Sequence, residues 1–338
     1  MKKTIIYLLI GIVSAFSIIA LLVKSSNKKN KIELVQKRNI NKQLVLIKSI
    51  KFENILGMMK KTKNDITFAC FDNVDGNSIF YFDTIRKKIR KKIELNIPIE
   101  KIVVDNYFYS KHGLFIVNSI NGTLLKISSD GNIIEKFTYP KKFFRVDNRD
   151  DLFLISGWDK NFNLFHEKFN FSLKKISKIV FEDDYLKKYK SNGIALDGAY
   201  FSNDYFTVNM PYSVNRIYIF NENFNYTNKM DLIYNPITFK IRNGEDGNIY
   251  PDPNNLNPNK HAYLDSTNIF YCLLNESTKW DKSNKCYIDI YDLKNKKYKE
   301  SIKVVDFANS EPREIIVAGN RIYILFKSSL NIYLIKNK

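Results

Sequence analysis

The chain has 338 residues, 44% of them hydrophobic and 14% aromatic, and its 54 Lys and Arg against 35 Asp and Glu give a formal charge of +19. This composition excludes a disordered or collagen-like chain and allows one large all-β domain or two ordinary domains. The charge would suit a nucleic acid, but lysine is scattered among Asn, Ile, Phe and Tyr along the whole chain. A nucleic-acid partner is therefore not expected.

Residues 1–24 predict a membrane anchor. Two lysines precede an uncharged run from Thr4 to Val23, and about 20 apolar residues in a helix span the roughly 30 Å of a bilayer core. The run is longer than the core of a usual signal peptide, so we expect an uncleaved single-pass anchor, with a cleaved signal as the alternative. We expect the body on the extracytoplasmic side, because long domains cross largely regardless of flanking charge. Residues 25–42 are polar and predict a linker.

An apolar strand pattern recurs six times between residues 43 and 338. The copies are DITFAC (65–70), GLFIVN (113–118), DLFLIS (151–156), DYFTVN (204–209), NIFYCL (268–273) and RIYILF (321–326). A second aromatic strand follows each copy, a third and more polar strand usually comes next, and a strand ending in turn residues precedes most copies. Four strands per unit of about 45–50 residues are typical of β-propeller blades.

The sixth unit ends before its last polar strand. The stretch LVLIKSIKF (44–52) has the same make-up as YKESIKVVDF (298–307), so we expect it to pair with 331–336 and to close the ring, which leaves no inner sheet edge exposed. In repeat number, strand order and closing strand, residues 43–338 resemble the six-bladed β-propeller superfamily, in particular its TolB-like and NHL-like groups. The resemblance implies an all-β fold and, as in many such bacterial domains, an exported binding platform.

The mouth of the central channel is the first candidate site. In a propeller the innermost strands line the axis and the chain enters them from one face. The residues that would surround the mouth are Glu100, Arg145, Asn192, His261, Arg313 and Glu314. The two arginines could hold a carboxylate or phosphate group, with a glutamate balancing the charge. The alternative is a network of Arg–Glu pairs that plugs the channel.

The second candidate is a long insertion, residues 234–265, before the fifth innermost strand. Insertions in repeat proteins gather on one face, which is often the binding face. Glu245, Asp246 and Asp252 could offer oxygen atoms to calcium, but they lack the order of a calcium-binding loop. We therefore expect no cofactor, with calcium as the one alternative.

Three cysteines, Cys70, Cys272 and Cys286, are too few for a disulfide framework. The latter two fall on neighbouring predicted strands, where they would be either buried thiols or a bridge across the strands.

No stretch of the sequence names a reaction, since neither a GxSxG nor an HExxH motif is present. We therefore predict no catalytic residues and expect a monomeric, membrane-anchored binding or scaffold module for a protein or peptide partner. The alternative function is a metal-dependent hydrolase or lactonase-like enzyme with its site at the axis.

Overall fold

The structure is a computed structural model. It describes residues 13–19, 32–52, 56–62, 65–72, 76–97, 104–118, 122–141, 143, 145–149, 151–159, 163–170, 175–179, 183, 192–235, 239–245, 249–252, 255–276, 285–304 and 311–338.

Four separate antiparallel sheets follow one another along the chain, each built of four strands in sequence order. The first contains β2 (Leu56–Lys61), β3 (Asp65–Asp72), β4 (Gly76–Asp83) and β5 (Lys88–Leu95). The second contains β6 (Val104–Ser110), β7 (Gly113–Asn118), β8 (Thr123–Ile127) and β9 (Ile133–Thr138). The third contains β10 (Arg145–Arg149), β11 (Leu152–Trp158), β12 (Leu164–Asn170) and β13 (Lys175–Ile179). The fourth contains β14 (Gly198–Ser202), β15 (Phe206–Pro211), β16 (Arg216–Asn221) and β17 (Tyr226–Asp231).

Short polar turns join the strands within each sheet. Between β4 and β5, the carboxylate of Asp83 accepts hydrogen bonds from the backbone N–H groups of Ile85 and Arg86, each at 2.8 Å. Lys87 completes this turn in the left-handed region, with φ of +53°. Asp residues favour such turns because their side chains bond the nearby backbone. The turn residues of the sequence thus set the length of each hairpin.

The remaining long strands form one eight-stranded sheet of order β20-β21-β22-β23-β1-β26-β25-β24. Its strands are β20 (Asn259–Leu264), β21 (Ile269–Asn275), β22 (Cys286–Asp292), β23 (Lys297–Val304), β24 (Glu314–Ala318), β25 (Arg321–Leu325), β26 (Ser329–Asn337) and β1 (Lys42–Lys51). Strand β1 runs antiparallel to β26 along its whole length, from Lys42 opposite Asn337 to Lys51 opposite Ser329. It meets β23 at a single pair. The predicted pairing of the first soluble strand with the last one is confirmed.

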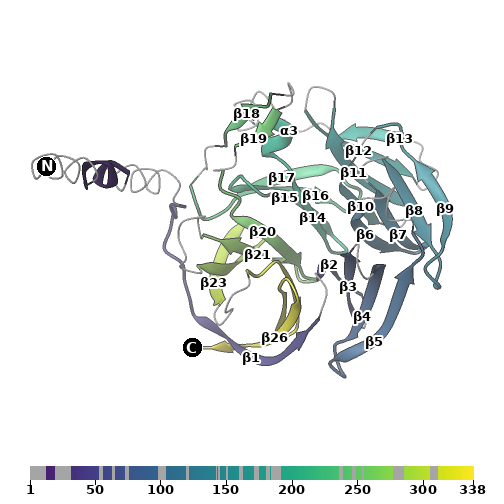
Figure 1. Cartoon of the computed structure of the whole chain (residues 1–338), viewed down its shortest axis with the longest axis horizontal. Coiled ribbons are helices and arrows are strands. Elements are labelled where there is room, and N and C mark those ends of the chain that lie inside the picture. The colour runs from purple at the N-terminus through teal and green to yellow at the C-terminus, as the bar shows by residue number, and fades with distance from the viewer. Residues whose placement is uncertain are drawn as a thin grey trace, which may run out of the picture.

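The sheets stand around a common axis (Figure 1). The first strands of successive units touch in the order β2, β6, β10, β14, β20, β24 and back to β2. This closed circle of innermost strands is the arrangement of an all-β propeller. In the predicted insertion, β18 (Ile241–Asn243) and β19 (Ile249–Pro251) form a small hairpin beside the short helix α3 (Asn192–Ala195).

Buried apolar side chains fill the spaces between neighbouring sheets. Between the second and third sheets, for example, the Phe153 ring lies 5.9 Å from that of Phe108 and 6.4 Å from that of Phe115. Comparable clusters join each neighbouring pair of strand groups around the described part of the ring. Strands packed on both faces read as continuous apolar runs, which explains why the recurring pattern lacks clean alternation.

The segment before β1 lies against the ring from Ile32 onward, so the described part of the predicted linker, residues 32–42, is in contact with the domain. Ile32 is buried in a cluster between β16 and β21, and Leu34 forms a β-bridge with Tyr234. Arg38 donates to Asp289 at 2.9 and 3.1 Å and also to Glu276. Its guanidinium lies 4.0 Å from the centre of the Tyr287 ring.

Residues 13–19 are helical. Within the described ranges, the structure contains no helix of the length and apolar character that crossing a membrane requires. Most of the predicted anchor, residues 1–12 and 20–24, lies outside the described residues.

Candidate functional site

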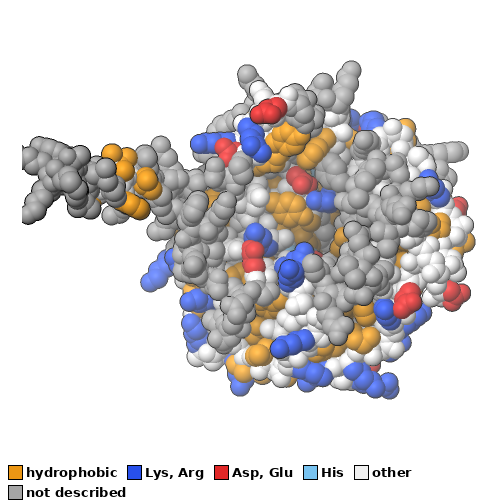
Figure 2. All heavy atoms as spheres, in the orientation of Figure 1, with side chains coloured by type: hydrophobic (Ala, Val, Ile, Leu, Met, Phe, Trp, Pro, Cys, Tyr) orange, Lys and Arg blue, Asp and Glu red, His pale blue; other side chains and the backbone are white. Residues whose placement is uncertain are grey.

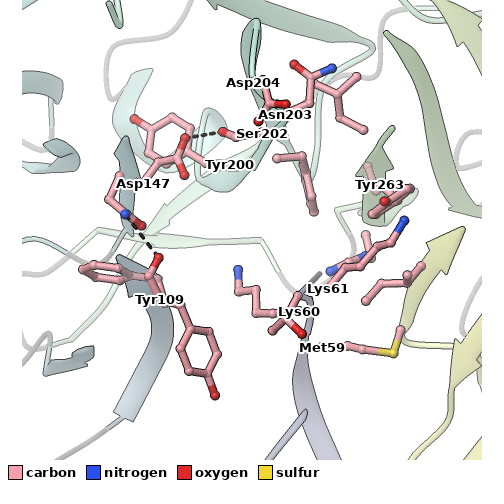
Figure 3. A pocket seen from close by; sticks show the side chains of 18 of the residues that line it. Met59, Lys60, Lys61, Tyr109, Asp147, Tyr200, Ser202, Asn203, Asp204 and Tyr263 are labelled. Carbon is pink, nitrogen blue, oxygen red and sulfur yellow. Dashed lines mark hydrogen bonds between the residues drawn. The ribbon is translucent and has the colours of Figure 1, made fainter. Parts of the chain in front are cut away.

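A cavity of about 810 Å³ lies at the axis of the ring, and all six innermost strands contribute to its wall. It is lined by their later residues and by the turns that follow them, among them Thr62, Asp204 and Ser266. Figure 3 shows side chains from several strands pointing into this space. The volume is within the usual range for a site that encloses a small ligand or a few residues of a peptide, roughly 300–1,000 Å³.

Lys60 on β2 is the central cation of the cavity. Its side chain reaches into the space between the strands (Figure 3). Among the residues that the structure describes, the Lys60 ammonium has neither a hydrogen-bond acceptor nor an ion-pair partner. Burial lowers the pKa of Lys60, and the charge of Arg145 adds to this, while the charges of Asp147 and Glu314 oppose it.

Asp147 on β10 is one of the two carboxylates whose charges act on Lys60. Its Oδ2 accepts hydrogen bonds from the hydroxyl of Ser202 and, at 2.8 Å, from the hydroxyl of Thr207. These donors come from β14 and β15, so the neighbouring sheet fixes the carboxylate. The charge of Asp147 opposes the lowering of the Lys60 pKa, although the two side chains form no ion pair in the described part of the chain.

Aromatic side chains form much of the remaining wall. The hydroxyl of Tyr109 donates to that of Tyr81 at 2.8 Å, and the hydroxyl of Tyr200 bonds to Nδ1 of His166. The Nζ of Lys61 lies 5.6 Å from the centre of the Tyr263 ring. Burial raises the pKa of Tyr263, so its hydroxyl stays protonated at neutral pH and can donate a hydrogen bond.

His261 on β20 stands in the wall beside Glu314 of β24. Its Nδ1 accepts a hydrogen bond from the backbone N–H of Ile315 at 3.3 Å, and its Nε2 lies 3.7 Å from a carboxylate oxygen of Glu314. Burial lowers the pKa of His261 to about 4, with the charge of Lys60 acting in the same direction and that of Glu314 against it. The imidazole is therefore neutral at pH 7, with its proton on Nε2.

Glu314 is held in place by β2. Its two carboxylate oxygens accept hydrogen bonds from the backbone N–H groups of Met58, at 2.6 Å, and Met59. Met58 has φ of +57°, and the pairing of β2 with β3 shifts register between Gly57 and Lys60. This bulge turns successive N–H groups toward one carboxylate.

The structure brings together two of the six residues predicted at the channel mouth, His261 and Glu314. Of the four predicted residues whose side chains are described, only His261 lines the cavity. Arg145 forms a different pair, with Asp197 at 3.3 Å, and donates to the carbonyl of Gly198 at 2.6 Å. Arg313 is exposed, and its backbone N–H donates to the carbonyl of Leu325.

For two of the six predicted residues, the structure does not describe the side chain. Asn192 begins α3, where its side chain is not described, and Glu100 lies outside the described residues. A binding role for the set of six remains a prediction.

Sequence reasoning missed the residues that dominate the cavity, chiefly Lys60, Asp147 and Tyr263. It considered the first residues of the innermost strands, whereas the cavity lies along their later residues. One usable signal was present, because an Asp closes both FFRVDN (143–148) and HAYLDS (261–266) before the turn. An Asp in this position is typical of a turn, but Asp147 lines the cavity.

Within the described ranges, no three His, Cys, Asp or Glu side chains gather in a way that could hold a metal ion. Glu245 and Asp252 of the predicted calcium ligands are described, whereas Asp246 is not. Cys272 and Cys286 are free, buried thiols in the structure. Burial raises the pKa of both, so neither thiol is activated toward metal or substrate.

The charged side chains on the face shown in Figure 2 are of both signs. Lys and Arg lie around the outline of the ring, and Asp and Glu occur between them. Nucleic-acid binding would require a continuous basic stripe; this face carries interspersed charge instead.

No family model matches the sequence, and no curated protein does either. Among solved structures, a member of the DUF4221 family from Bacteroides vulgatus has a TM-score of 0.55 at 13% identity, covering 92% of this chain and 100% of that chain. A catalytically inactive virginiamycin B lyase from Staphylococcus aureus, solved with quinupristin, has a TM-score of 0.50 at 13% identity, covering 87% and 98%. At such identities the likeness shows the fold alone, and that fold is a β-propeller.

Proposed function

We propose that this chain is a six-bladed β-propeller that serves as a binding module, with the axial cavity as its ligand site. The circle of six innermost strands supports the count. In the eight-stranded sheet, β20 to β23 would form one blade and β24 to β26 with β1 another, because β1 joins β23 only at the pair Lys42 and Ile302. The narrower likeness to TolB-like and NHL-like propellers remains a prediction from repeat number and strand order.

The observation that carries the binding role is the convergence of all six innermost strands on one polar cavity. Its walls are held before any ligand arrives, since Asp147, Tyr109 and Tyr200 are each hydrogen-bonded to neighbouring side chains. A preorganised site loses little conformational entropy on binding. We propose that its ligand is a short segment of a peptide or protein partner.

A peptide selection on the full-length protein in detergent tests this function. Peptides recovered from a random library would be measured against the wild type, Tyr263→Ala in the cavity and Tyr250→Ala on β19 of the insertion. We expect Tyr263→Ala to weaken binding at least tenfold and Tyr250→Ala to leave it unchanged, with thermal unfolding confirming that both variants fold. The reverse result would place the site on the insertion, and a selection without specific peptides would contradict the binding role.

We further propose that residues 1–24 anchor a monomeric propeller in the cytoplasmic membrane, with the ring on the extracytoplasmic side. The uncharged run between Thr4 and Val23 supports this location. Protease would be added to intact cells and to spheroplasts. If the ring lies outside the cytoplasmic membrane, protease should digest it in spheroplasts. A ring that stays intact in spheroplasts would contradict this location. N-terminal sequencing of the membrane fraction would separate an anchor from a cleaved signal.

A further inference from the structure

We infer that the cavity recognises a carboxylate group, which Lys60 binds as an ion pair. This inference rests on the proposed function, because it requires the axial cavity to be the ligand site. It names the chemical group on the partner: an acidic side chain or the terminal carboxylate of the inserted segment.

The first step is the contrast between Lys60 and three shielded arginines that have carboxylate partners. Arg38 pairs with Asp289, Arg145 with Asp197, and Arg216 with both Asp183 and Asp231. The Lys60 ammonium has no such partner among the described residues. Lys60 is half-buried in the cavity wall. An ammonium that is partly shielded from water and has no counter-ion is unfavourable, so a ligand that supplies a negative charge gains affinity at this atom.

The second step concerns how much negative charge the cavity accepts. Asp147 and Asp204 line it, and Glu314 stands behind His261. A carboxylate brings one negative charge beside Lys60, whereas a phosphate brings up to two and places them near the same acidic residues. The balance of fixed charges therefore favours a carboxylate over a phosphate.

The third step concerns the surroundings of the ammonium. Phe201 and Tyr263 provide aromatic wall for the hydrocarbon part of a ligand. The Tyr263 hydroxyl has no hydrogen-bond partner among the described side chains, and as a protonated phenol it offers a donor to a bound oxygen. Figure 3 shows Lys60 and Tyr263 entering the cavity from different strands. The cavity thus offers a carboxylate ligand a cation and a neutral donor from two different strands.

Chemical labelling of lysines tests the inference on the full-length protein. An amine-acetylating reagent would be applied with butyrate, with the neutral isostere butyramide or with inorganic phosphate, at constant ionic strength, and peptide mass spectrometry would follow Lys60. We expect butyrate to slow Lys60 acetylation at least threefold, phosphate to slow it less and butyramide to leave it unchanged. Lys92 on outer strand β5 serves as the control and should be labelled equally in all samples.

Two Lys60 variants and one control variant complete the test, which measures the rise in Tm that butyrate should cause in the wild type. Lys60→Met should abolish the butyrate-induced rise in Tm, and Lys60→Arg should retain part of it, while Lys92→Met should behave as the wild type. Equal protection by butyrate and butyramide, or an unchanged butyrate response in Lys60→Met, would overturn the inference.

The outcome is separable from that of the binding function. Selected peptides that need Tyr263 but bind equally well after amidation and Glu→Gln replacement would leave the binding module standing without its carboxylate. Butyrate protection of Lys60 without any peptide that depends on the cavity would support the carboxylate site and contradict the peptide-binding role.

Discussion

Arg38, in the segment before β1, is buried. Lys60, at the axis, is half-buried. The surroundings of these two cations differ. Two carboxylates and an aromatic ring surround the guanidinium of Arg38, whereas the described residues offer the Lys60 ammonium no partner. Satisfied buried charge fixes one arrangement of the chain, and unsatisfied charge persists only where something offsets it. The comparison distinguishes Arg38, which stabilises the fold, from Lys60, which we propose binds a ligand.

The largest expected effect comes from breaking the satisfied pair. Asp289→Ala would leave Arg38 buried beside Glu276 alone and remove the acceptor of the Ser301 hydroxyl. We expect a loss of about 3–5 kcal/mol in the free energy of unfolding, measured by urea denaturation, because removing one partner strands the other charge. Glu94→Ala at the exposed pair with Lys92 is the matched control and should change stability by less than about 1 kcal/mol. Similar losses of unfolding free energy in the two variants would show that the buried pair of Arg38 contributes no more to stability than an exposed pair.

An intermediate effect on stability is expected from acidification, which tests whether His261 in the cavity wall is neutral. The unfolded imidazole of His261 has an ordinary pKa of 6.5, and burial lowers the pKa in the folded chain to about 4. Its contribution to stability is therefore fully present above pH 6.5 and is lost as the pH falls toward 4, by up to about 3 kcal/mol.

His261→Gln should reduce this pH dependence of the unfolding free energy. His166, whose pKa burial lowers to about 3, would retain its own share of the slope in the same direction. Urea denaturation between pH 4 and 7 measures the difference. An identical slope in variant and wild type would mean that His261 is protonated in the fold.

The smallest expected effect has the opposite sign. Lys60→Met should raise the free energy of unfolding of the ligand-free protein by about 1–2 kcal/mol, because it replaces an uncompensated ammonium by an apolar side chain of similar length. Urea denaturation without carboxylate buffers measures it. A destabilised variant would show that Lys60 contributes to the fold, as Arg38 does, and would break the comparison.

The repeat made the fold accessible from sequence. Each unit carries its own recurring apolar strand, which is the second strand of its sheet, and its own turn residues. The likeness of 44–52 to the strand 298–307 indicated its place beside β26. The contact of residues 32–41 with the ring was not predictable in the same way. Their mixed and largely polar composition is typical of a linker, and the buried positions of Ile32 and Arg38 depend on partners about 200 or more residues away.

The cavity was harder to predict for a geometric reason. Side chains alternate between the two faces of a strand, and a single inserted residue reverses the assignment. The bulge in β2 lies between Gly57 and Lys60. Met59 belongs to the apolar cluster between sheets and also reaches the cavity wall, and Lys60 lines the cavity. Nothing in the letters MMKK announces that bulge, so a lysine at the axis could not be told from one facing solvent.

The pairing of β1 with β26 also sets the order of events in synthesis. The N-terminal strand leaves the ribosome among the first segments, but its antiparallel partner ends at Asn337. Until translation has passed that residue, the nascent chain carries β1 without this partner, as an edge that other strands can join. A stalled or prematurely terminated product would therefore be prone to aggregation through β1.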